Sequence, residues 1–204
     1  MSSRPVASAL TTSSRVVALP NLLSLGRIAL VPVVVGFLFW PTPTARAWAG
    51  ALFLIACITD FLDGWLARRH GITTVLGQFL DPLADKLIVS ASLIMMIEHG
   101  PEPRVPAWMV ATIVVREIAV TGLRGIAVRS GIVVPADDLG KFKMVFQMFA
   151  VESLLIHYRY ALPGVGWAID FHAAGMLFMW IALILSVWSA VDYHVRILRQ
   201  VQLE

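Results

Sequence analysis

The sequence is poor in charged residues and in cysteine. Only 14% of its 204 residues are charged and 58% are hydrophobic, whereas a typical soluble domain carries about 25% charged residues. The single cysteine, Cys57, cannot form an internal disulfide, and no Cys/His cluster offers a site for soft metals. With a mean hydropathy of +0.79, this composition excludes an ordinary soluble domain and a disulfide scaffold, and we expect no nucleic-acid partner.

The apolar residues fall in long runs. A helix needs about 20 apolar residues to cross a bilayer. The chain contains six apolar runs of about this length, separated by short breaks. We expect an all-α integral membrane protein in which a flexible cytoplasmic tail, residues 1–19, precedes one six-helix domain, residues 20–204. The expected transmembrane helices cover residues 25–40, 46–70, 79–98, 107–129, 140–157 and 167–195. A secretory signal is the competing interpretation of the first run, but Arg27 would interrupt it and further runs follow.

The basic residues predict the orientation of these helices. Arg46, Arg104 and Arg159 lie by the loops after the first, third and fifth runs, and the other thirteen of the sixteen basic residues lie toward the opposite side. The positive-inside rule therefore places both termini in the cytoplasm of a multi-pass protein of the cell (inner) membrane.

Four aspartates interrupt the second and third runs. Asp60 and Asp63 lie near the end of one run, and Asp81 and Asp85 near the start of the next. Spacings of three and four residues put each pair on one face of its helix. Because residues 71–78 form a short loop, we expect the two helices to be antiparallel neighbours. Ionisable groups at membrane depth usually face a bundle interior or a wet cavity, so the four carboxylates should converge.

Four converging carboxylates would repel one another unless cations lay between them. Oxygen-only ligands select hard ions such as Mg²⁺ or Mn²⁺, and paired ions commonly clamp a phosphoryl group during in-line displacement. The sequence therefore predicts two divalent cations acting on a diphosphate. The alternative is a solvated helix end, or salt bridges from the aspartates to Arg68, Arg69 and Lys86.

The wider pattern resembles the signature of the CDP-alcohol phosphotransferases. Its eight fixed residues at fixed spacing are here Asp60, Asp63, Gly64, Ala67, Arg68, Gly77, Asp81 and Asp85. The resemblance implies a six-helix, usually homodimeric fold with a two-metal site open to the cytoplasm, where an alcohol displaces CMP from a CDP-linked group. By this similarity Asp60, Asp63 and Asp81 are metal ligands, and Asp85 is the general base and a further candidate ligand.

The resemblance also implies a binding site for the CDP moiety. Gly64, Arg68 and Thr74 would contact it, and Gly77 would let the backbone approach a ligand closely. Taken alone, each glycine is better explained by helix packing or a turn than by ligand binding. Asn21, at the cytoplasmic mouth, is a further candidate contact.

Segments around the signature are similar to the phosphatidylglycerophosphate synthases within this family. They comprise residues 21–24, 59–64, 79–86, 116–117, 122–124 and 140–143, together with Arg27 and Pro32. This similarity implies transfer of a phosphatidyl group from CDP-diacylglycerol to the sn-1 hydroxyl of glycerol 3-phosphate. A cardiolipin synthase, a phosphatidylserine synthase or an inositol-phosphate transferase is the nearest alternative. From another class, a divalent-ion transporter would also bind metal, although transporter sites usually lie near the membrane midplane.

The acceptor needs cations beside the metal site, because glycerol 3-phosphate carries a dianionic phosphate. Arg116, Arg124, Lys141 and Lys143 supply them on the cytoplasmic side of the fourth and fifth runs. Arg124 and Lys141 are equally explained as charges that orient the helices. No ion pair is expected between Arg116 and Glu117, because adjacent helical residues point to different faces.

Overall fold

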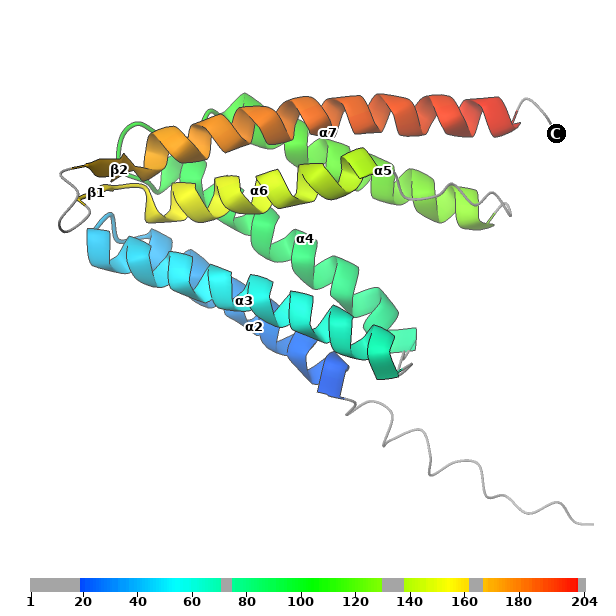
Figure 1. The fold of residues 1–204 in the computed structure, drawn as a ribbon, viewed down its shortest axis with the longest axis horizontal. Helices are drawn as coiled ribbons and strands as arrows, with labels where there is room; N and C mark the ends of the chain where they lie inside the picture. The colour runs from blue at the N-terminus through cyan, green and yellow to red at the C-terminus, as the bar shows by residue number, and fades with distance from the viewer. Residues whose placement is uncertain (1–18, 71–74, 130–137, 162–166, 202–204) are drawn as a thin grey trace, which may run out of the picture.

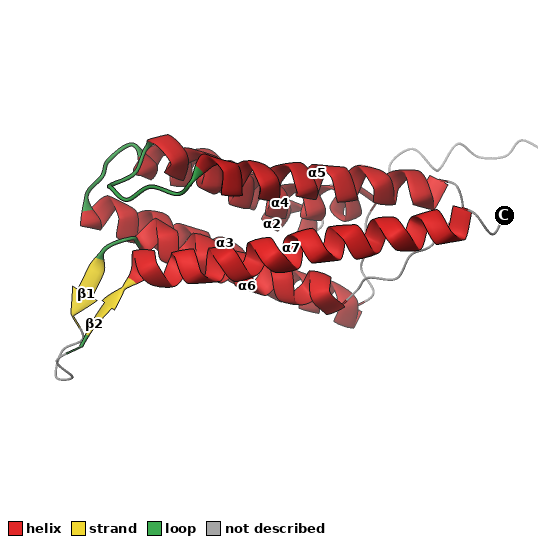
Figure 2. Cartoon of the chain, turned by 90° about the horizontal axis from the view of Figure 1, so that it is seen from above, coloured by secondary structure: helices red, strands yellow, loops and turns green. Residues whose placement is uncertain are grey.

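The computed structural model describes residues 19–70, 75–129, 138–161 and 167–201. Six helices and one two-stranded hairpin make up this part of the chain (Figures 1 and 2). In chain order they are α2 Leu19–Leu38, α3 Pro43–His70, α4 Val75–Glu98, α5 Ala107–Arg129, α6 Asp138–Ile156, β1 Arg159–Ala161, β2 Ala168–Asp170 and α7 Phe171–Val201. The six predicted helices are all present, and the short hairpin is the departure from an all-α chain.

The first helix of the bundle packs against the two that follow it. α2 packs along both α3 and α4, whereas within the described residues α3 and α4 touch each other at only a few positions. α6 and α7 form the most extensive pair, and α5 packs against α7 and α4. In Figure 1, α2 and α3 diverge from α7, and α4 crosses between the two groups. The expected contact between α3 and α4 is therefore limited within the described residues, and α2 packs against both helices.

One apolar core receives side chains from all six helices. Its members include Val34 of α2, Phe53 of α3, Leu93 of α4, Leu154 of α6 and Met179 of α7, all 1% exposed or less, and α5 contributes three more buried residues. α6 and α7 approach closely at Gly175, where an added Cβ would lie 2.7 Å from Cγ of Leu154. A tight interior therefore ties the last two helices to the rest of the bundle.

The outer surface of the bundle is apolar as well. Large side chains such as Phe61, Ile118 and Trp188 are 69, 68 and 66% exposed. Two stretches, Pro43–Leu62 and Phe171–Ile197, are long and apolar enough to cross a membrane, and Leu22–Leu38 is a shorter apolar helix. Exposed apolar surface on this scale indicates contact with something other than water.

Five of the six helices begin at other residues than the sequence predicted, and α4 and α7 show an earlier and a later start. α4 begins at Val75, so Pro82 lies inside the helix, where it cannot donate a backbone hydrogen bond to the carbonyl one turn earlier. The expected loop over residues 71–78 is thus helical from residue 75, and residues 71–74 lie outside the described chain. α7 begins at Phe171 instead of residue 167, because Asp170 caps it: its Oδ1 accepts a hydrogen bond of 2.9 Å from the N–H of Ala173.

The hairpin marks one end of the bundle, which we call the hairpin end. Here β1 and β2 pair antiparallel, with Arg159 opposite Asp170 and an ion pair of 3.2 Å between them. Arg46 is fully buried beneath this end; its guanidinium donates to the carbonyl of Leu38 at 3.2 Å and to that of His99. These bonds satisfy carbonyls at the ends of α2 and α4 that no helical N–H can reach.

Candidate functional site

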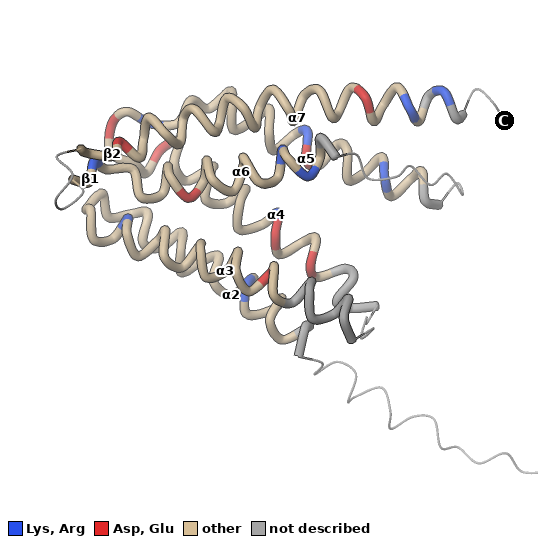
Figure 3. The backbone as a smooth tube through the Cα atoms, viewed as in Figure 1, with Lys and Arg blue, Asp and Glu red and all other residues tan. Residues whose placement is uncertain are grey.

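The candidate site lies away from the hairpin end, where charged residues of α2, α3 and α4 come together (Figure 3). Ser24 and Arg27 are both buried and, three residues apart, share one face of α2. The hydroxyl of Ser24 donates to Oδ1 of Asp81, and the guanidinium of Arg27 pairs with Oδ1 of Asp60. α2 thereby brings a carboxylate of α3 and a carboxylate of α4 to the same level of the bundle.

The third described aspartate, Asp85, belongs to the same group. It lies one turn beyond Asp81 on α4, is partly exposed, and interacts electrostatically with Asp60, Arg27 and Lys86. α2 thus contacts one aspartate of α3 and one of α4, and Asp85 interacts electrostatically with Asp60; the convergence of these carboxylates around an ion stays a prediction.

The described donors suit hard divalent ions by their chemistry, because all of them are carboxylate oxygens. Within the residues whose side chains the structure describes, no three acidic, histidine or cysteine side chains are grouped closely enough to hold an ion. The fourth predicted ligand, Asp63, lies outside those residues. The metal site therefore stays a prediction, and Arg27 holds the Asp60 oxygen that faces α2.

The predicted CDP contacts lie outside the described part of the molecule. Gly64, Arg68, Gly77 and Asn21 fall in helical stretches whose side chains are not described, and Thr74 lies between α3 and α4 in residues 71–74.

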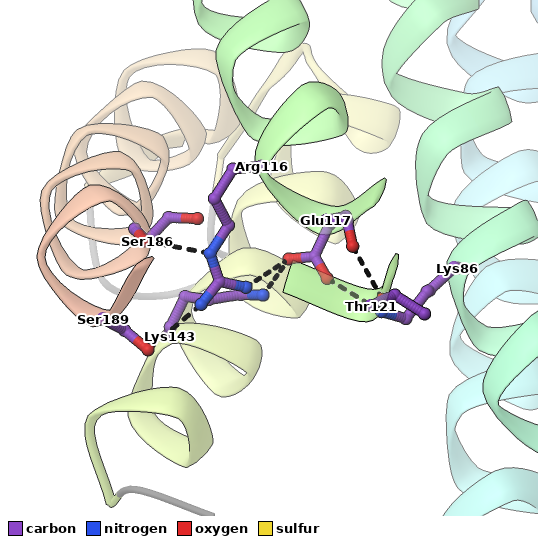
Figure 4. A network of polar contacts seen from close by, with 7 residues as sticks. All are labelled: Lys86, Arg116, Glu117, Thr121, Lys143, Ser186 and Ser189. Atoms are coloured by element: carbon purple, nitrogen blue, oxygen red, sulfur yellow. Dashed lines mark hydrogen bonds and ion pairs between the residues drawn. The ribbon is translucent and has the colours of Figure 1, made fainter. Parts of the chain in front are cut away.

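A second charged cluster joins α4, α5 and α6 around one carboxylate (Figure 4). Glu117 of α5 accepts Lys86 Nζ on Oε2 at 3.2 Å and Arg116 Nη1 on Oε1 at 3.1 Å, and Lys143 of α6 contacts the same Oε1. Lys86 also donates to the hydroxyl of Thr121. We call Lys86, Arg116, Glu117 and Lys143 the cation cluster; since Lys86 follows Asp85 directly, it adjoins the aspartates.

The expectation that Arg116 and Glu117 form no ion pair is wrong. Their Cα–Cβ bonds do point to different faces, but the arginine side chain is long enough to turn back toward its neighbour. Its other nitrogens reach α7: Nε donates to the carbonyl of Ser186 and Nη2 to the hydroxyl of Ser189, both at 3.0 Å. Arg116 thus connects the last helix to the cation cluster, as Figure 4 shows.

Of the four predicted acceptor-binding residues, the structure brings Arg116 and Lys143 together. Arg124 lies farther along α5, exposed, with its guanidinium 5.6 Å from the centre of the Tyr193 ring. Lys141 is exposed on the first turns of α6. The geometry of these two fits the interpretation as peripheral charges as well as it fits acceptor binding.

The sequence analysis did not identify Ser24, Arg27 and Glu117 as interaction partners of the other charged residues of the site. Ser24 and Arg27 had a visible signal, since they are polar residues three apart on a helix that is otherwise apolar. Glu117 had one too, because an acidic residue between basic ones at membrane depth needs partners. The ion pair from Lys86 to an aspartate, considered as an alternative to a metal site, is replaced in the structure by the contact with Glu117.

Comparisons with known proteins identify the family of the chain. The model of the CDP-alcohol phosphatidyltransferase family matches residues 17–188. The chain is 41% identical over 187 residues to a CDP-diacylglycerol–glycerol-3-phosphate 3-phosphatidyltransferase of Bacillus subtilis, covering 86% of this chain and 92% of the relative. It is also 36% identical over 204 residues to a probable phosphatidylglycerophosphate synthase of Mycobacterium tuberculosis, covering 98% and 91%. A third relative, CDP-diacylglycerol–glycerol-3-phosphate 3-phosphatidyltransferase 2 of Arabidopsis thaliana, is 33% identical over 216 residues, covering 97% and 87%. With a family match over most of its length and the signature aspartates gathered by α2, the chain belongs to the CDP-alcohol phosphatidyltransferase family.

Proposed function

We infer that this protein is a phosphatidylglycerophosphate synthase. It transfers the phosphatidyl group of CDP-diacylglycerol to the sn-1 hydroxyl of glycerol 3-phosphate and releases CMP. One observation carries this inference: the eight-residue signature stands complete in a chain whose relatives from three distant organisms are named for this activity or for its product. The donor is a lipid, which agrees with the apolar outer surface of the bundle.

The aspartates would hold the donor. Asp60, Asp63 and Asp81, with Asp85 as a further ligand, would bind two divalent cations, Mg²⁺ or Mn²⁺, as befits a family of metal-dependent enzymes. When bound, these cations neutralise charge on the diphosphate and on the departing CMP. Gly64, Arg68, Thr74, Gly77 and Asn21 remain the proposed contacts to the CDP moiety.

Asp85 is the proposed general base. Its carboxylate accepts the proton of the sn-1 hydroxyl, whose oxygen forms a bond to the phosphorus that carries diacylglycerol. The bond from that phosphorus to the CMP oxygen breaks, and CMP leaves with its electron pair. Asp85 interacts electrostatically with Asp60 and with Lys86 and Glu117 of the cation cluster, which supports a role beside both groups.

The acceptor would be held through its phosphate by the cations. Arg116 and Lys143 are the best-supported contacts because the structure brings them together, and Arg124 and Lys141 remain proposed contacts at the periphery. The fixed geometry of hydroxyl, base and donor then supplies much of the acceleration, because little reorganisation remains.

The proposed setting is a homodimer in the cell (inner) membrane. Each chain would cross the bilayer six times, with both termini and the active site on the cytoplasmic side. The positions of the basic residues support this orientation, since Arg46, Arg104 and Arg159 belong to the hairpin end and its loops. CDP-diacylglycerol would enter sideways, with its acyl chains left in the lipid.

An acceptor assay tests the reaction. The purified protein in lipid nanodiscs is incubated with CDP-diacylglycerol and with glycerol 3-phosphate, serine, inositol 1-phosphate or phosphatidylglycerol in turn, with and without Mg²⁺ or Mn²⁺. We expect CMP release and a new phospholipid with glycerol 3-phosphate alone. Turnover with another acceptor only would make the protein a sister enzyme, and divalent-ion flux into proteoliposomes without CMP release would make it a transporter.

A further inference from the structure

Glu117 is an acidic residue in a place where the proposed reaction calls for positive charge. It lies at the centre of the cation cluster, and its carboxylate would repel the phosphate of the acceptor if it stood alone. Its own side chain is 13% exposed, those of Arg116 and Lys143 are 11 and 8% exposed, and that of Lys86 is 35% exposed. A buried carboxylate at this depth is costly unless it is paired, so its presence calls for an explanation.

We propose that Glu117 is a positioning residue that fixes Lys86, Arg116 and Lys143 as a preformed binding site for the dianionic phosphate of the acceptor. This proposal rests on the proposed function and deepens it, because it says how an acceptor with a phosphate monoester is selected.

The contacts of Glu117 support a positioning role. One carboxylate holds cations from three helices, since Lys86 belongs to α4, Arg116 to α5 and Lys143 to α6. Lysine and arginine side chains each carry about 2 kcal/mol of rotamer entropy when free. Anchoring them before the substrate arrives removes that cost from the binding step.

Each cation keeps capacity for a second anion. A lysine ammonium has three donors and an arginine guanidinium has five. Lys86 uses donors on Glu117 and Thr121, and Arg116 uses donors on Glu117, Ser186 and Ser189 (Figure 4). Lys86 is the most exposed cation of the cluster and follows the proposed base Asp85 in the chain.

The charges of the cluster match those of the ligand. Three cationic side chains and one carboxylate leave a net charge of two positive. A phosphate monoester has a second pKa of about 6 and therefore carries two negative charges at neutral pH. Without the carboxylate, three like charges would repel one another and separate, whereas a site with fewer cations would leave the phosphate incompletely neutralised.

The test replaces Glu117 and measures the Michaelis constants of both substrates separately. Glu117→Gln keeps the shape of the side chain but removes its charge, so the cations lose their common anchor. We expect the KM for glycerol 3-phosphate to rise by about 10-fold or more, because the variant loses one set of charge-assisted hydrogen bonds. The KM for CDP-diacylglycerol should stay within about 2-fold, since none of its proposed contacts belongs to the cation cluster. Glu117→Asp, which retains a carboxylate on a shorter chain, should recover most of the affinity for the acceptor.

A matched control separates positioning from stability. Glu152→Gln removes another largely buried carboxylate, on α6 and next to Gly50 of α3, outside the cation cluster. We expect its KM for glycerol 3-phosphate to equal that of the wild type. If Glu117 were merely structural, the Gln variant would lose folded protein and turnover number while this KM stayed unchanged, and that result would overturn the proposal.

A binding measurement tests the role of Glu117 even if the protein does not use glycerol 3-phosphate as its acceptor. Inorganic phosphate and glycerol 3-phosphate are added to the metal-loaded protein without donor, and the shift of Tm is recorded. The wild type should be stabilised and the Glu117→Gln protein should lose most of that shift. Retention of the full shift would contradict the positioning role, whereas loss of it in a protein that does not use glycerol 3-phosphate would refute only the proposed reaction.

Discussion

The buried arginine side chains at the two ends of the helix bundle bind different kinds of partner. At the hairpin end, Arg46 is buried and donates to the carbonyls of Leu38 and His99, and Tyr158 donates to the carbonyl of Pro41 at 2.6 Å. In the other half, Arg27 and Arg116 are also buried or nearly so, but each pairs with a carboxylate. Figure 3 shows charged positions on α2, α3, α4, α5 and α6 in the half away from the hairpin.

This difference in arginine partners indicates which part of the molecule can bind a ligand. The guanidinium of Arg46 donates through Nη2 to two carbonyls at helix ends, and this contact joins elements of the fold. Carboxylates and cations that pair with each other can exchange partners when a diphosphate, a metal or a phosphate arrives. We therefore expect substitutions of the buried charged residues away from the hairpin to affect ligand binding, and substitution of Arg46 to affect stability.

Removal of divalent cations should have the largest effect. Excess chelator should abolish CMP release, a drop of at least about 100-fold, because the aspartates then lack the ions that hold the diphosphate. Adding Mg²⁺ or Mn²⁺ back should restore the rate while the helical content, followed by circular dichroism, stays constant. Full activity in chelator would show that the aspartates act without metal.

Replacement of the proposed base comes next. Asp85→Asn should lower kcat by at least about 100-fold, the usual contribution of a general base, and leave the elution profile in detergent unchanged. Asp192→Asn is the matched control, because Asp192 pairs with Arg196 at 2.7 Å on α7, away from the aspartates. Near-normal turnover of the Asp85 variant would remove this residue from the role of base.

At the hairpin end the expected effect is on stability. Arg46→Met keeps the apolar stem but leaves two buried carbonyls without donors, so we expect a loss of about 2 to 3 kcal/mol in the free energy of unfolding. Thermal unfolding in detergent measures it, and activity per folded molecule should be retained. Arg104→Met is the control, because this arginine is 44% exposed in the loop of the same end. Equal Tm values for the two variants would show that the backbone contacts of Arg46 do not stabilise the hairpin end.

The smallest effect is expected between α6 and α7. Gly175→Ala adds a methyl group 2.7 Å from Cγ of Leu154, so one of the helices must shift. Overpacking of this kind costs about 1 to 3 kcal/mol. The Tm should fall, while the KM for glycerol 3-phosphate stays unchanged; a rise in this KM would show that the α6–α7 contact also sets the cation cluster.

The sequence predicted the six helices because each is a long apolar run with a clear break, and it predicted the aspartate group because charged residues are conspicuous at membrane depth. It did not predict that α2 packs against both α3 and α4, since adjacency along the chain favours neighbours in sequence. Aspartate is a common residue before a helix, so the capping of α7 by Asp170 could have been predicted. The preceding segment contains glycine and proline, and for this reason the start of the last helix was placed too early.

The contacts of the cation cluster were harder to foresee. The side chain of Arg116 bends back to Glu117 and also reaches Ser186 and Ser189, and these contacts depend on how α7 packs against α5. Spacing along one helix says nothing about partners on helices seventy residues away. Acceptor candidates could therefore be named from charge, whereas their grouping required the fold.

The bond from Arg116 to α7 has a consequence for biosynthesis. The aspartate group needs only α2, α3 and α4, which leave the ribosome first, but the guanidinium of Arg116 finds its carbonyl and hydroxyl only on the last helix. A nascent chain that has inserted only its early helices would therefore lack these two bonds, and the side chain of Arg116 reaches its observed position only after the last helix has packed against α5.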